Sequence, residues 1–105
     1  MFTINGINWN LIFVNNSSPN LLRSDGTTSL AVTDWNRKSI FVSLAPKGAY
    51  LRRIITHEIT HAICFSYGIT LSLEQEERLC DFVATYGDEI FEIVDIVLGA
   101  VRRVG

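Results

Sequence analysis

The chain has 105 residues, of which 48% are hydrophobic and 19% are charged, and its net charge is −2. This length and composition describe one folded domain, residues 1–105, rather than a disordered chain. They argue against direct nucleic-acid binding, because the sequence has no Lys- or Arg-rich stripe, and against a membrane span, because it has no run of about 18 apolar residues.

The N-terminal residues, Met1 to Gly6, lack the basic start and apolar core of a secretory signal peptide. We therefore expect a cytoplasmic protein. In that compartment Cys64 and Cys80 are expected to be free thiols rather than a disulfide.

Residues 1 to about 46 are rich in Asn, Ser, Thr and β-branched residues, which is typical of strands and loops. We predict strands at Asn8–Val14, Ser29–Thr33 and Ser39–Ser43. The polar segment 15–20 is predicted to be a loop, and the polar segment 34–38 predicts a hairpin between the last two strands. Together these segments predict a small N-terminal antiparallel sheet.

From Gly48 onward, apolar residues recur with helical spacing, and Gly68 is a suitable stop for the first helix. Ser72 to Gln75 has the form of a capping box and should open a second helix that ends at Gly87. We expect the core stripe of this second helix to comprise Leu79, Phe82, Val83 and Tyr86.

A third helix is predicted to start near Asp88, with Arg102 and Arg103 at its end, an arrangement that suits the helix dipole. Its inward-facing residues should be Ile90, Ile93, Val94, Val97, Leu98 and Val101. The predicted fold class is therefore α+β, a small sheet followed by three helices. The sequence fits either a monomer, in which this third helix packs internally, or a homodimer.

Both histidines of the chain lie in the segment His57-Glu58-Ile59-Thr60-His61. Residues four apart share a helix face, so both imidazoles can reach one Zn²⁺ ion while Glu58 addresses a water beside it. Glu58 also falls in the middle of the apolar arc of its helix. A buried carboxylate without a partner is costly, by several kcal/mol as an order of magnitude, so Glu58 is expected to have a partner or a chemical role.

A catalytic zinc takes three protein ligands and keeps one position open for water. We favour Glu77 as the third ligand over Glu76. Asp81, one turn after Glu77, could accept a hydrogen bond from the second nitrogen of a ligand histidine. Cys64 lies near the ligand side of the first helix, where a sulfur ligand is conceivable, but buried cysteines more often serve as small apolar residues.

The stretch from Ile55 to Ala62, followed by Glu77-x-x-Cys80-Asp81-x-Val83-Ala84, resembles the ImmA/IrrE-type metallopeptidases, minimal gluzincins often carried by phages and mobile elements. The third-ligand helix of that family reads Glu-x-x-Ala-Asn/Asp-x-Phe-Ala, so Cys80 and Val83 depart from it. The resemblance covers roughly residues 29 to 86. It implies a zincin-like fold and a protein substrate such as a repressor or other regulator.

Residues and resemblance together predict a zinc-dependent peptidase with ligands His57, His61 and Glu77 and with Glu58 as general base. Tyr67 and Tyr86 are candidates for stabilising the transition state. One alternative is a non-catalytic binding protein, an antirepressor or inhibitor on a zincin scaffold. Another is a structural zinc site closed by a fourth protein ligand, for which Cys64 is the convenient residue.

Overall fold

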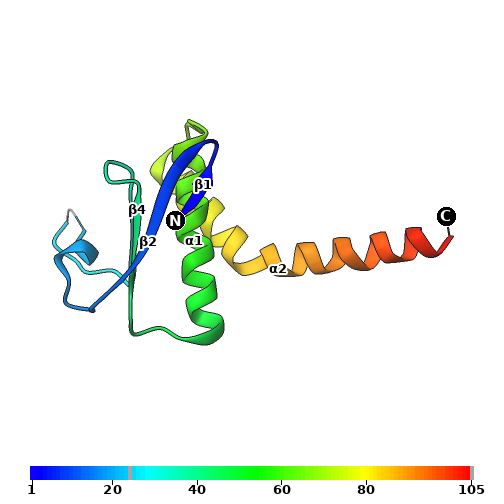
Figure 1. Cartoon of the computed structure of the whole chain (residues 1–105), viewed down its shortest axis with the longest axis horizontal. Helices are drawn as coiled ribbons and strands as arrows, with labels where there is room; N and C mark the ends of the chain where they lie inside the picture. The colour runs from blue at the N-terminus through cyan, green and yellow to red at the C-terminus, as the bar shows by residue number, and fades with distance from the viewer. Residues whose placement is uncertain (24, 105) are drawn as a thin grey trace.

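The computed structural model describes residues 1–23 and 25–104, with the side chains of the last helix described up to residue 100. The fold is α+β, as predicted. A four-stranded sheet lies against α1, and α2 packs on α1 before running out beyond the body of the fold (Figure 1). The inward position expected for Val101 and the dipole role expected for Arg102 and Arg103 concern side chains outside this description.

The sheet opens with a hairpin of β1 (Phe2–Ile4) and β2 (Ile7–Val14). Its two-residue turn is Asn5-Gly6, and both residues have positive φ, 50° and 75°. Asn-Gly is the preferred pair for such a turn because each residue tolerates the left-handed conformation better than most others do. The predicted strand at Asn8–Val14 is thus confirmed, whereas β1 was not predicted.

A 3₁₀ turn (η1, Pro19–Leu21) follows β2, and a second hairpin joins β3 (Ala31–Asp34) to β4 (Ser39–Ser43). This hairpin confirms the predicted one. The strand order is β1-β2-β4-β3, and β2 pairs in parallel with β4. The sheet is therefore mixed, and the prediction of an antiparallel sheet was wrong.

The parallel pair arises from the long connection after β2. The connection after β2 skips the position next to β2, so β3 forms the edge of the sheet. β4 then returns to the skipped position, between β2 and β3. All five residues of β4 are buried. A strand that is this buried on both faces is most stable in the interior of a sheet.

The core lies between the sheet and α1 (Gly48–Ser66). Trp9, Ile40 and Val42 from the sheet meet Ala62 of α1, and each is fully buried. The indole N–H of Trp9 donates a 2.9 Å hydrogen bond to Ser66 Oγ, so the polar atom of the largest core side chain has a partner.

The turn between the two helices follows the predicted end and start signals. The amide of Gly68, whose φ is +62°, donates to the carbonyl of Phe65, and the amide of Ile69 donates to the carbonyl of Cys64. Ser72 Oγ accepts from the amide of Gln75, and the Gln75 side chain accepts from the amide of Ser72. The predicted stop at Gly68 and the capping box at Ser72 are both confirmed.

The chain has two α-helices among its described residues, not the predicted three. α2 (Leu73–Val104) continues through Gly87 without a break. A single internal glycine costs a helix only about 1 kcal/mol. In addition, the Asp88 carboxylate does not cap a new helix but binds the Arg52 guanidinium at 2.7 and 2.8 Å. No helix in the described part of the chain combines the length and apolarity needed to cross a bilayer.

The predicted core stripe of α2 was also largely wrong. Up to residue 100, the buried residues of this helix are Cys80 and Gly87, while Leu79, Phe82 and Tyr86 are all more than one-third exposed. The face of α2 that carries Cys80 lies against α1, so the larger apolar side chains point away from α1. The residues expected to face inward beyond Asp88 are exposed as well: Ile90, Ile93, Val94, Val97 and Leu98.

Candidate metal centre

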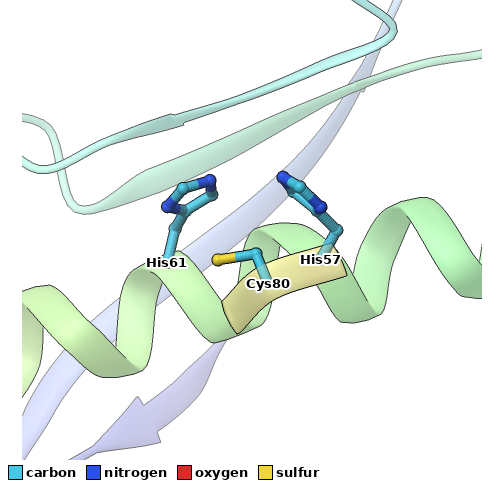
Figure 2. A group of neighbouring side chains, drawn as sticks. All are labelled: His57, His61 and Cys80. Carbon is cyan, nitrogen blue, oxygen red and sulfur yellow. The ribbon is translucent and has the colours of Figure 1, made fainter. Parts of the chain in front are cut away.

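His57 and His61 lie one turn apart on α1, and both rings rise from the same side of the helix (Figure 2). Their centroids are 5.0 Å apart. Both side chains are largely buried, and α2 passes beside them at Cys80. The i, i+4 spacing thus places two imidazoles side by side between α1, α2 and β3.

Glu77 of α2 reaches both rings. One carboxylate oxygen lies 3.0 Å from Nε2 of His61, and the other lies 3.3 Å from Nε2 of His57. Two ligands of a tetrahedral zinc, each about 2.0–2.1 Å from the ion, lie about 3.3 Å apart. Each of these two oxygen–nitrogen distances is close to that spacing, and the two contacts are made by different oxygens of Glu77.

The second nitrogen of each ring contacts a different carboxylate. Nδ1 of His57 lies 3.0 Å from Asp81 Oδ1, and Nδ1 of His61 lies 2.6 Å from Glu76 Oε2. A hydrogen bond donated from Nδ1 to a carboxylate leaves the Nε2 lone pair free for a metal and orients the ring. Glu76 was considered only as a rival ligand from the sequence, and its position beside His61 Nδ1 was not predicted.

Glu58 lies at the edge of this cluster, 8% exposed. Its Oε1 accepts a 2.9 Å hydrogen bond from the hydroxyl of Thr33 on β3, and its Oε2 lies 3.9 Å from Nε2 of His57. The expected partner of this buried carboxylate is therefore Thr33, a contact between distant parts of the chain that the sequence did not indicate. Thr33 holds one oxygen and leaves the other directed toward the histidines.

The charge of the cluster favours a divalent cation. Four carboxylates, those of Glu58, Glu76, Glu77 and Asp81, surround two imidazoles. Even with both histidines protonated, the cluster would carry a charge of −2, from four negative and two positive groups. With neutral histidines that carry their proton on Nδ1, the Nε2 lone pairs would face the Glu77 oxygens without a proton or an ion between them. The residues therefore fit a bound Zn²⁺, whose usual donors are imidazole nitrogen and carboxylate oxygen.

Both cysteines are free and buried. The Sγ of Cys80, not that of Cys64, joins His57 and His61 in a group whose ligand atoms all lie within 4.8 Å of one another (Figure 2). Burial raises the pKa of the Cys80 thiol, with the neighbouring Cys64 and Glu77 adding to the shift. A closed structural zinc site would therefore use Cys80 as its fourth ligand, rather than the Cys64 considered from the sequence.

Two open hollows, of about 200 and 260 Å³, adjoin the cluster. Both are lined by Ala31, His57 and Glu58, so they meet at the site beside β3. Neither is lined by Tyr67 or Tyr86, the two tyrosines considered for the transition state. Instead Arg23 lines the first hollow and Tyr50 lines the second, and both side chains carry hydrogen-bond donors.

Comparisons with known proteins leave the chain without an identified family, since no protein-family model, no curated protein and no solved structure matches it.

Proposed function

We propose that this protein is a zinc-dependent peptidase in which His57, His61 and Glu77 hold the metal and Glu58 is the general base. The observation that carries the proposal is the approach of one Glu77 carboxylate to both imidazole Nε2 atoms, at 3.0 and 3.3 Å, beside a buried glutamate. A purely structural site has no use for a proton acceptor held next to its ligands. The presence of Glu58 there therefore supports hydrolysis.

Zinc, when bound, would act as a Lewis acid on the scissile carbonyl and would lower the pKa of its bound water toward neutral pH. The protein's own groups handle the proton. Glu58 accepts it from the attacking water and later donates it to the leaving amine. Thr33 fixes the orientation of the Glu58 carboxylate, while Asp81 and Glu76 hold the two imidazoles in the orientation that their role requires.

The substrate is proposed to be an extended protein segment that pairs with β3. This strand is at the edge of the sheet, next to β4 on one side only, and both hollows adjoin it. Main-chain hydrogen bonds to an edge strand hold a peptide in register while side-chain pockets select its sequence. By the resemblance described above, a repressor or other regulatory protein in the cytoplasm is the proposed target.

The proposal is tested by incubating the zinc-loaded protein with an unfolded, proteome-derived polypeptide library and identifying new N-termini by mass spectrometry. We expect cleavage by the wild type and its loss with Glu58→Gln, which keeps the shape of the side chain but removes the base. General-base catalysis contributes about 10²–10⁴-fold in rate. Cleavage at equal rates by both proteins would contradict the role of Glu58. Retention of an uncut polypeptide by both would favour the binding-protein alternative.

A second expectation concerns Thr33. Thr33→Val keeps the shape of the side chain but removes the hydroxyl that donates to Glu58. We expect turnover to fall at least about tenfold, because a hydrogen bond to a charged group contributes about 1.5–3 kcal/mol, with zinc affinity unchanged. Thr33→Ser should restore turnover. Loss of zinc in Thr33→Val, or a serine variant as slow as the valine variant, would show that Thr33 acts through packing instead.

A further inference from the structure

An exposed apolar stripe runs along α2, on a side of the helix that does not face α1. Its members recur every three or four residues, and every one of them is at least 37% exposed. The stripe consists of Leu79, Phe82, Tyr86, Ile90, Ile93 and Val97. Contiguous apolar surface of this extent is rare on a monomer and marks an interaction site.

The second half of the stripe lies on the part of α2 that extends beyond α1. The last ion pair between α1 and α2 is that of Arg52 with Asp88, and residues 89–104 project about 24 Å beyond it (Figure 1). The radius of gyration, 16.1 Å, exceeds the roughly 13 Å of a compact chain of this length. Seven large apolar residues of this segment, Ile90, Phe91, Ile93, Val94, Ile96, Val97 and Leu98, are between 41% and 68% exposed.

Such a segment is not stable alone in water. A helix of about 16 residues is marginal even when it is rich in alanine, and this one is rich in Ile and Val, which are weaker helix formers. Packing against a partner would stabilise it. The charge pattern of the segment indicates which partner.

The acidic residues of the projecting helix, Glu89, Glu92 and Asp95, precede its basic residues, which occupy positions 102 and 103 of the sequence. Two copies side by side in parallel would place acid beside acid. Two antiparallel copies would place the acidic half of each helix beside the basic end of the other. Positions 89 and 103 are four turns apart and therefore fall on the same flank of the stripe, the flank on which charges meet across an antiparallel pair.

We propose that the protein forms a homodimer in which the projecting halves of two α2 helices pack antiparallel about a twofold axis. With Glu89 of one copy opposite Arg103 of its partner, Ile93 of each copy falls almost level with Val97 of the other. The interface is then self-complementary, as a twofold dimer requires. Each charge pair occurs twice, and the apolar stripes bury one another.

The test is sedimentation equilibrium of the full-length protein and of three variants, Glu89→Arg, Arg103→Glu and the combination of the two. The wild type should have twice the 11.8 kDa mass of one chain. Each single variant places like charges opposite one another and should weaken dimerisation at least about tenfold, whereas the double variant should recover it. Ile93→Asp should abolish the dimer, and Asp95→Asn, on the polar face, is the matched control that should preserve it.

A monomeric wild type at micromolar concentration would overturn the proposal. The antiparallel arrangement would be overturned if neither charge reversal weakened dimerisation, or if the double variant failed to restore it. Because Ile93→Asp could also unfold its own helix, circular dichroism and zinc content are measured on the same samples. Loss of the dimer with zinc content retained supports the interface. Loss of zinc would show that the substitution disturbs the body of the fold instead.

Discussion

Replacement of Glu77 by alanine is expected to weaken zinc binding by more than about 100-fold. Glu77 is the residue of α2 that faces both imidazole Nε2 atoms, so its loss leaves a two-histidine site. Loss of an outer contact costs less, typically about 10–100-fold in metal affinity. Glu76→Gln, which alters only the contact with His61 Nδ1, should therefore fall in that smaller range.

The measurement is competition for zinc against a chromophoric chelator. Glu74→Ala is the matched control, because Glu74 lies on the same helix but pairs with Arg78 at the surface. It should bind zinc like the wild type. If Glu76→Gln proved more damaging than Glu77→Ala, the assignment of ligand and supporting residue would have to be exchanged.

The second large effect is expected at Trp9, on stability rather than on metal binding. Trp9 is fully buried between the sheet and α1, and Trp9→Ala should cost about 3–5 kcal/mol in free energy of unfolding. That is a large share of the roughly 5–15 kcal/mol that stabilises a domain of this kind. Urea denaturation followed by circular dichroism would measure it.

Ser66→Ala separates the two contributions of Trp9. It keeps the packing but leaves the indole N–H without its partner, so a smaller loss of about 1–3 kcal/mol is expected. A Trp9→Ala variant destabilised by less than about 1 kcal/mol would show that the core is not centred on this residue.

Local signals in the sequence predicted much of the fold. The capping residues Ser72 and Gln75 and the stop at Gly68 act through hydrogen bonds and backbone conformation within a few residues, so they can be read from the sequence. The turn at Asn5-Gly6 carries an equally local signal, one of the strongest for a hairpin, yet β1 was not predicted from it.

The features that were not predicted depend on distant parts of the chain. The parallel pairing of β2 with β4 is set by the path of the connection between β2 and β3. The spacing of apolar residues in the sequence does not indicate that path. α2 continues through Gly87, and Asp88 pairs with Arg52, thirty-six positions earlier in the sequence, instead of capping a new helix. Leu79, Phe82 and Tyr86 are exposed because α2 turns the face that carries Cys80 toward α1.

The candidate site likewise combines residues that local spacing predicts with contacts that depend on the tertiary fold. The spacing of His57 and His61 places them on one helix face, and the four-residue spacing of Glu77 and Asp81 does so on the next helix. The contacts of Glu76 with His61 and of Thr33 with Glu58 each join separate elements. They depend on the relative placement of α1, α2 and β3, which the sequence alone does not provide.

The most direct test of an open, three-ligand zinc site is X-ray absorption spectroscopy at the zinc edge of the reconstituted protein. Zinc bound by nitrogen and oxygen has ligands at about 2.0–2.1 Å, whereas a thiolate sulfur lies at about 2.3 Å. We expect one zinc per chain with nitrogen and oxygen neighbours only, from His57, His61, Glu77 and a water. A sulfur neighbour that disappears in Cys80→Ala would contradict this account and define a closed, structural site.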